Sequence, residues 1–297
     1  MTLDVFLDYL KNTRNMSENT IEAYKRDIMA FRDFAARSGV KDLQDVTNTN
    51  IVAYLLELKN SGKSKSTVSR KLASLRAFYR YLQSRGIIEE NPTDDIRSPK
   101  IGRKKISYLS VQSVEKLLSL PDDSIKGKRD RAILELMYAT GIRVSEIIEM
   151  RLSDLNLKVG FVALNGKHGG ARIVPMGRPA RRAVTEYIET SRRALMKDGD
   201  PEDPAGILFV NYLGQPFTRQ GFWKILKKYG EEAHLEEKLT PQTLRNSFAM
   251  HMVQNGIDIK SLQELMGHED IAATQMYFGD VRNRIKDIYD RCHPRAK

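Results

Sequence analysis

The sequence has very little cysteine, since Cys292 is the single one among 297 residues. One thiol cannot form an intrachain disulfide, so a disulfide framework is excluded, and so is a zinc site built from several cysteines. Long apolar runs are missing as well, because no stretch reaches the ~18 residues that a membrane-spanning helix requires. Asp4 and Asp8 interrupt residues 1–12, which therefore lack the continuous apolar stretch of a signal peptide. We expect a cytoplasmic protein that does not associate with membranes.

Low-complexity tracts are absent too, and 41% of the residues are hydrophobic, an ordinary value for a chain that folds. Acidic residues are the scarcer charge: 38 Asp and Glu stand against 49 Lys and Arg, which gives a formal net charge of +11. The pI is about 9.5. Such an excess of positive charge favours a polyanionic partner. With a membrane set aside, nucleic acid is the partner that the composition predicts.

The length predicts two domains, at roughly 150 residues each. Residues 98–108 hold Pro99, Gly102 and four basic residues without an acid, a composition typical of a linker. We therefore predict a first domain at 1–97, a basic linker at 98–108 and a second domain at 109–297. A basic linker can also follow a phosphate backbone, so DNA contacts are predicted for Arg103, Lys104 and Lys105.

The first domain shows helical periodicity and no strand pattern. Ser17 begins a run of apolar residues three and four positions apart that ends near Gly39, and further helices are predicted at 51–58 and 66–86. The last of these carries basic residues and no acidic one. A solvated helix face usually mixes both signs of charge. This predicts a phosphate-facing surface, with a plain solvated face as the alternative. The stretch from Lys63 to Arg85, which includes this helix, has the basic residues Lys63, Lys65, Arg70, Lys71, Arg76, Arg80 and Arg85.

The second domain is mixed. A β-hairpin is predicted from residues 160–164 and 172–174, which flank a glycine-rich turn, and a further strand from 207–210. The rest is helical, so the predicted fold class is mainly α with a small β element. Helices are predicted at 111–120, 128–138, 144–150, 179–196, 219–233, 241–255 and 258–266.

Four short motifs in the second domain combine arginine, lysine, histidine and tyrosine. They are ATGIRVSE at 139–146, GK at 166–167, QTLR at 242–245, and MGH at 266–268 followed by MY at 276–277. In these motifs, their order and their spacing, the sequence resembles the tyrosine recombinases, the phage-integrase-type family, and more narrowly the Xer group. The closing HPRA at 293–296 is similar to the Xer tail. The resemblance implies an N-terminal helical SAM-like core-binding domain and a mixed α+β catalytic domain.

The resemblance also implies a reaction. It is site-specific recombination of double-stranded DNA through a 3′-phosphotyrosyl intermediate, without metal, ATP or another cofactor. Family members act as tetramers on paired sites, so the implied assembly is a homo- or hetero-tetramer with a second Xer-type recombinase. Within the Xer group the implied role is the resolution of chromosome dimers at segregation, often with a DNA translocase as a further partner.

Tyr277 is the predicted nucleophile. Cutting a DNA strand without losing the bond energy needs a covalent nucleophile, and a tyrosine phenolate provides one. With 12 tyrosines in the chain, a packed aromatic is the default for any one of them. The position of Tyr277 nine residues after His268, in a polar stretch, sets it apart, and the resemblance assigns it the attack.

Two arginines are predicted to hold the phosphate. Arg143 and Arg245 carry planar forks of donors that suit non-bridging phosphate oxygens, and two such forks can replace metal ions in the transition state. Glu146 follows Arg143 by three residues, so the alternative to a functional role is a simple surface salt bridge between the two. We expect Glu146 to orient the arginine.

The resemblance gives roles to three further residues. Lys167, in the hairpin turn, is the general acid for the departing 5′-oxygen, and Arg172 on the same hairpin is a DNA contact. The family hairpin usually reads GKGxKxR and here reads GKHGGAR, which keeps both residues. His268 is implied to form a hydrogen bond with the scissile phosphate and to exchange a proton with the tyrosine. A metal role for it is not expected, since the five histidines form no HExxH motif.

Gln242 departs from the family pattern, which usually has His-x-x-Arg on this helix. A glutamine amide can donate a hydrogen bond to phosphate but cannot exchange a proton near neutral pH. Asn246 likewise replaces a common histidine. Because the nucleophile, both arginines, the lysine and His268 are present, we predict an active enzyme in which Gln242 serves as a donor.

Three alternatives remain at this stage. The first is the integrase of a mobile element; many integrases carry an additional arm-binding domain before the core-binding helices with which this chain begins, and this favours the housekeeping role. The second is a type IB topoisomerase, against which the Xer-like tail argues. The third is a DNA-binding paralogue that has lost or weakened its catalysis, which Gln242 keeps open.

Overall fold

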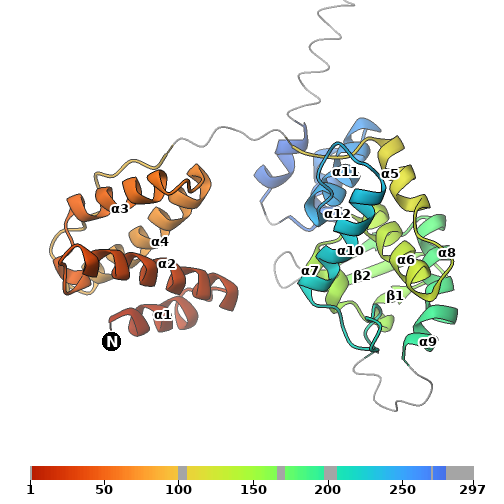
Figure 1. Cartoon of the computed structure of the whole chain (residues 1–297), viewed down its shortest axis with the longest axis horizontal. Coiled ribbons are helices and arrows are strands. Elements are labelled where there is room, and N and C mark those ends of the chain that lie inside the picture. Colours follow the sequence, from red (N-terminus) through yellow and green to blue (C-terminus); the bar gives the residue numbers. More distant parts are fainter. Residues whose placement is uncertain (1, 100–105, 166–170, 197–205, 269, 279–297) are drawn as a thin grey trace, which may run out of the picture. The chain divides into compact units, whose positions relative to one another are not determined.

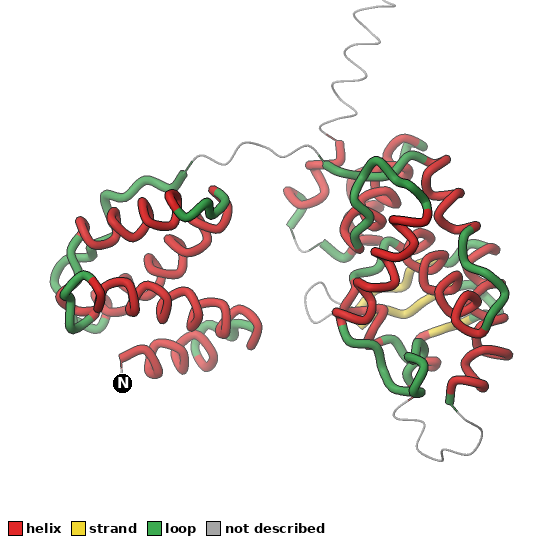
Figure 2. The backbone as a smooth tube through the Cα atoms, in the orientation of Figure 1, coloured by secondary structure: helices red, strands yellow, loops and turns green. Residues whose placement is uncertain are grey.

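The computed structural model describes residues 2–99, 106–165, 171–196, 206–268 and 270–278. The chain divides into two compact units, Met1–Lys104 and Lys105–Lys297. The division falls inside the predicted linker at 98–108, whose two ends stay predictions. Helices dominate both units, and among the described residues all named strands belong to the second one (Figures 1 and 2).

The first unit is helical, as the sequence predicts. Ser17 and Ser64 each begin a long helix, because their side-chain oxygens accept the main-chain N–H groups of Thr20 and Thr67. The predicted helices at 17–39, 51–58 and 66–86 are confirmed, and a short helix precedes them. The elements are α1 (Thr2–Asn12), α2 (Glu18–Arg37), the 3₁₀ turn η1 (Leu43–Asp45), α3 (Asn48–Asn60) and α4 (Lys65–Ser84).

Aromatic rings form much of the core of this unit. Phe6, Phe31, Phe78 and Tyr79 are all fully buried, and the rings of Phe6 and Phe78 meet edge to face with centroids 5.4 Å apart. The hydroxyl of Tyr79 donates to the main-chain carbonyl of Leu43, so its burial leaves no unpaired polar atom. The unit therefore has a hydrophobic core of its own.

The second unit surrounds a larger core with helices and one small sheet (Figure 1). The helices predicted in this part are confirmed with shifts of a few residues at their ends, and 179–196 contains a π-helical turn. The helical elements are α5 (Val111–Ser119), α6 (Ile125–Thr140), α7 (Val144–Glu149), η2 (Leu152–Asp154), α8 (Arg178–Glu186), η3 (Tyr187–Arg192), α9 (Arg193–Leu195), α10 (Arg219–Glu232), α11 (Pro241–Gln254) and α12 (Ile259–Met266). Residues 272–278 are helical as well.

The sheet has three antiparallel strands in the order β1 (Leu155–Asn156), β2 (Phe161–Asn165) and β3 (Ala171–Pro175). The predicted hairpin is confirmed as β2 and β3, and Val162 and Leu164 of β2 face the core while their neighbours are exposed. The strand predicted at 207–210 is wrong. Ile207 and Val210 each form only a single bridge, to Arg151 and Pro216, and these two partners lie in different segments, so no ladder can extend.

The last residues of the predicted linker are partly buried against the second unit. Ile106 and Tyr108 contact the apolar cluster that contains Phe248 and Tyr277. The N–H of Leu109 donates to Ser247 Oγ on α11, at 2.9 Å. A composition that is typical of a linker thus continues into a segment that belongs to the core of the second unit.

Candidate active site

Helix α11 carries three residues of the site, of which Arg245 and Asn246 are buried and Gln242, in the first turn, is exposed. Thr240 caps it by accepting the N–H of Thr243, and Pro241 occupies the first helical position, where its missing N–H costs nothing. Gln242, Arg245 and Asn246 then follow at spacings of three and four, which place their side chains together. Arg245 is 4% exposed.

Arg143 comes from the sharp turn between α6 and α7. Gly141 ends α6 with a φ of 58°, and a Cβ at this position would lie 2.3 Å from a ring carbon of Phe248, so only glycine fits. Two residues later the N–H of Arg143 donates to Glu146, at 2.8 Å, which starts α7. The turn therefore brings Arg143 beside α11.

The two predicted phosphate-binding arginines meet at the end of α12. Arg143 donates to the main-chain carbonyl of Gly267, and Arg245 donates to that of Met266 at 2.6 Å. Arg245 also donates to the carbonyl of Gly141. Burial and the nearby charge of Arg143 lower the pKa of Arg245 to about 10, so its guanidinium remains charged at neutral pH. The structure therefore brings together the two forks that the sequence predicted.

Glu146 joins Arg143 to a third arginine. It accepts from Arg143 at 3.1 Å and from both terminal nitrogens of Arg172 at 2.7 and 2.9 Å. Burial by itself would raise the pKa of Glu146, but the hydrogen bonds from Arg172 and Arg143 outweigh it and the pKa is lowered. One carboxylate thus faces three guanidinium groups including Arg245, and the cluster keeps a positive charge suited to a phosphate.

Arg172 is placed differently from its expected role. Its side chain is 8% exposed, and its Nε donates to the carbonyl of Leu265 in addition to the pair with Glu146. A side chain with so little exposed surface and with its nitrogens already bonded is poorly placed to contact a duplex. The structure instead shows it as a brace between β3, α7 and α12.

His268 lies directly after Gly267, which ends α12 with a φ of 60°. Its Nε2 lies 3.3 Å from a nitrogen of Arg245, and its Nδ1 lies 2.8 Å from Thr274 Oγ1. Because arginine can only donate, Nε2 accepts and the ring proton is on Nδ1. Burial, together with Arg245 and Arg143, lowers the pKa of His268 to about 4, so the imidazole is neutral at pH 7.

Tyr277 lies within this cluster. It is 2% exposed, and its ring stacks parallel to that of His268 with centroids 6.4 Å apart. Its hydroxyl donates to Asn246 Oδ1 at 2.9 Å. Burial raises the pKa of Tyr277, and the charge of Arg245 offsets part of this rise.

Gln242 is linked to Tyr277 through Asn246, because its Nε2 donates to the same Oδ1 at 2.8 Å. Asn246 itself was not among the predicted site residues. The signal for it in the sequence was its departure from the histidine that is common at this position. A departure alone does not reveal a contact with Tyr277, which comes from another helix.

Four predicted residues lie outside the described part of the chain, namely Lys167, Arg103, Lys104 and Lys105. The basic residues of α4 differ among themselves. Arg70 and Lys71 donate to Asp27, a buried carboxylate of α2, and Arg76 donates to Ser98 and to the carbonyl of Ile96. Arg70 is nevertheless 52% exposed. Lys65 and Arg80 of α4 are exposed too, as are Lys63 and Arg85, which flank the helix.

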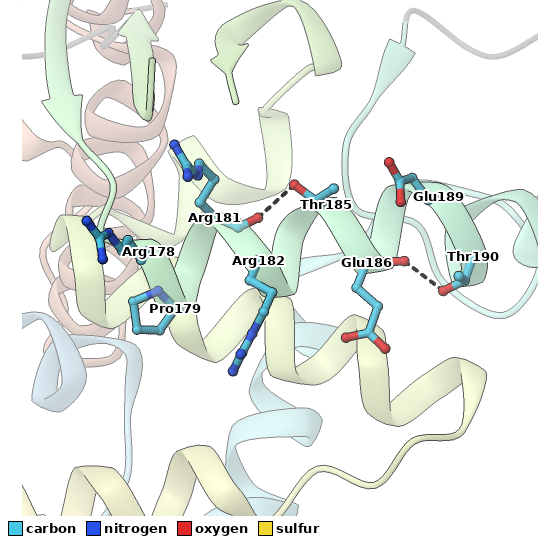
Figure 3. A pocket seen from close by; sticks show the side chains of 8 residues that line it. All are labelled: Arg178, Pro179, Arg181, Arg182, Thr185, Glu186, Glu189 and Thr190. Atoms are coloured by element: carbon cyan, nitrogen blue, oxygen red, sulfur yellow. Dashed lines mark hydrogen bonds between the residues drawn. The ribbon is translucent and has the colours of Figure 1, made fainter. Parts of the chain in front are cut away.

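An open pocket of about 710 Å³ lies along α8, and its lining includes Arg178, Arg182 and Glu186 (Figure 3). None of the site residues described above lines it. Within the described residues, no group of three or more His, Cys, Asp or Glu side chains could hold a metal ion. A search of the same residues finds no helix with the length and apolar character needed to span a bilayer.

The phage integrase family matches residues 107–283, more than half of the chain. The chain belongs to this family. The N-terminal SAM-like domain of phage integrases matches residues 3–86 of the same protein. The tyrosine recombinase XerD of Listeria innocua is 40% identical over 296 residues and covers 99% of each chain, so this tyrosine recombinase is of the XerD-like Xer group.

Solved structures share the fold of this recombinase. XerH bound to a palindromic difH substrate has a TM-score of 0.76 at 18% identity, covering 97% of this chain and 84% of that one. The Tn1549 transposon integrase in complex with transposon right end DNA has a TM-score of 0.75 at 22% identity, covering 97% and 99%. The helical SAM-like domain and the catalytic domain are thus confirmed as the architecture, and the enzyme is a site-specific recombinase.

Proposed function

We propose that this recombinase binds a double-stranded recombination site and exchanges strands through a covalent bond to Tyr277. One observation carries the proposal: Arg143, Arg245 and His268 converge on the turn that ends α12, and Tyr277 stacks on the histidine. This is a positively charged, largely buried site that includes a tyrosine hydroxyl. A phosphodiester matches it in charge, and its oxygens suit the guanidinium forks.

The two guanidinium forks would bind the scissile phosphate. Arg143 is the accessible one, with 31% of its side chain exposed, whereas Arg245 is buried beneath it. Each guanidinium has five N–H groups, and the bonds to described residues leave some of them for phosphate oxygens. Charge that develops on these oxygens in the transition state is stabilised in place.

In the proposed cleavage step, the Tyr277 oxygen forms a bond to phosphorus and the bond from phosphorus to the 5′-oxygen breaks. In the DNA-free protein the phenol proton is held by Asn246 Oδ1 and Nε2 of His268 faces Arg245. In the cleavage step Nε2 exchanges this bond for the phenol proton, and the 5′-oxygen takes a proton from Lys167. Burial and then the arginines lower the pKa of His268, and a bound phosphate favours this transfer because its negative charge opposes the arginines. Attack by the 5′-hydroxyl of a second strand reverses the step and joins the new pair.

A nicked suicide site tests the proposal, since loss of the short fragment beyond the nick traps the covalent intermediate. We expect wild-type protein to form an adduct that survives denaturing electrophoresis. Mass spectrometry of its peptides should show the DNA attached to Tyr277. Absence of any adduct with DNA that the protein binds would identify a non-catalytic paralogue. An adduct at another tyrosine would reject the assignment of the nucleophile.

We also propose the housekeeping role: resolution of chromosome dimers in the cytoplasm, by a tetramer of this chain alone or with a second Xer-type recombinase, coupled to a DNA translocase. The similarity to XerD over the whole chain supports it. The alternative is the integrase of a mobile element, which the fold of the Tn1549 enzyme keeps open. Sequencing the DNA trapped in cells separates them, because a housekeeping enzyme yields one chromosomal site and an integrase yields the ends of an element.

A further inference from the structure

Asn246 forms three hydrogen bonds that join three separate parts of the second unit. Its Nδ2 donates to the main-chain carbonyl of Ser107 at 2.9 Å. Its Oδ1 accepts from the hydroxyl of Tyr277 at 2.9 Å and from Gln242 Nε2 at 2.8 Å. The side chain is buried, with an exposure of 8%.

The carbonyl of Ser107 fixes the orientation of this amide. A main-chain carbonyl can only accept, so the amide must present its nitrogen to Ser107. The oxygen must then face Tyr277 and Gln242, and both of these have to donate. The proton of the nucleophile is thereby directed at Asn246.

Ser107 is exposed but has contacts on both sides. Its hydroxyl donates to Glu237 at 2.8 Å, and its neighbours Ile106 and Tyr108 pack against the apolar cluster that includes Tyr277. The carbonyl that orients the amide therefore belongs to a fixed segment.

We propose that Asn246 is a positioning residue for the nucleophile: its amide, oriented by the carbonyl of Ser107, sets where the Tyr277 hydroxyl lies and where its proton points. This deepens the proposed function and rests on Tyr277 being the nucleophile. An amide can accept the hydrogen bond but cannot take the proton, so Asn246 fixes geometry and leaves proton transfer to other groups.

The first test is the Asn246→Leu variant, which keeps the approximate size and loses all three hydrogen bonds. In single-turnover reactions on a nicked suicide site, adduct formation should slow by about 10- to 100-fold, because small displacements of a reacting group carry such costs. Affinity for an intact site should stay within about threefold, as Asn246 is buried.

The second test is Asn246→Asp, whose readout is the pH dependence of the rate. The ionised carboxylate has no donor for Ser107 and repels its carbonyl, so the variant should be slow at pH 8. The protonated carboxylic acid has one donor and one acceptor oxygen and can reproduce the wild-type bonds. The ratio of the variant rate to the wild-type rate should therefore rise at least fivefold between pH 8 and pH 5.5.

Ser247→Ala is the matched control. Ser247 holds the same segment through Leu109 and donates to Thr243, but no hydrogen bond joins it to Tyr277. Its adduct rate should stay within about threefold of wild type at each pH. Equal slowing by Ser247→Ala and Asn246→Leu, a wild-type rate in Asn246→Leu, or a flat rate ratio for Asn246→Asp would each overturn the proposal. Failure of the wild type to form an adduct would instead reject the proposed function.

Discussion

The single atom that decides the chemistry of Tyr277 is its hydroxyl oxygen. The ring is buried between His268 and the apolar cluster, so removal of the oxygen should leave the fold unchanged. We predict that Tyr277→Phe abolishes the covalent adduct while affinity for the site stays within about threefold. Gel-shift titration and a suicide-site assay on the same preparation measure both. Any adduct formed by Tyr277→Phe means that the nucleophile is misassigned.

Gln242 supplies a donor where the family usually has a histidine. If it acts only as a donor, Gln242→His should change the cleavage rate by less than about tenfold. Gln242→Ala should raise the barrier by about 2–4 kcal/mol, as for the loss of one oxyanion donor. Single-turnover cleavage measures both.

The hydrogen bond from Gln242 to Asn246 makes the double variant Gln242→His with Asn246→His the proper control. A rise of about 10² in either histidine variant would show that proton transfer matters at this position. If wild type were inactive and a histidine variant active, the natural protein would be a degenerate paralogue.

His268 should make the stability of the DNA-free protein depend on pH. Its pKa is about 4 in the folded chain and near 6.5 when unfolded, so between these values the unfolded state binds the additional proton. Its contribution is therefore complete above pH 6.5 and is lost as the pH falls toward 4. We predict that the melting temperature of His268→Gln falls less than that of wild type from pH 7 to pH 4.5. Parallel melting curves for the two proteins over this range would contradict the assigned environment of His268.

At the scale of the element, α4 shows that a run of like charges is not one surface. Asp27 on α2 pairs with two of its basic residues, and Ser98 and Ile96 engage a third. Only tertiary packing supplies these partners, because no acid occurs within the run itself. The DNA-facing role predicted for α4 now rests on its exposed members.

We predict that Lys65→Ala with Arg80→Ala weakens binding to all DNA sequences. It should reduce the slope of log affinity against log salt by about 0.9 for each phosphate that the protein no longer neutralises. Arg32→Ala with Arg37→Ala is the control, because it removes the same two positive charges. These arginines pair with Asp33 and Glu57, so we do not expect them to bind phosphates. Equal changes of slope in both double variants would indicate a general effect of net charge.

At the scale of the whole molecule, the two units have separate cores, and the boundary between them is set by packing. We predict that fragment 106–297 melts several degrees higher than fragment 109–297, which lacks Ile106, Ser107 and Tyr108. Those residues contribute apolar burial and the acceptor for Asn246. Calorimetry of the two fragments measures the difference, and equal melting temperatures would support a boundary at 109.

The sequence by itself determined the helices and the hairpin, because periodicity and caps are local properties. The candidate reacting groups came from the resemblance of its motifs to a known family. The sequence also separated a helical part from a mixed one. Tertiary structure alone decided which side chains meet. Arg172 became a brace on Glu146, and Asn246 became the partner of Tyr277, because each contact joins residues at least 26 positions apart. The strand predicted at 207–210 failed for the same reason. A strand requires a neighbouring strand, and its own residues do not specify one.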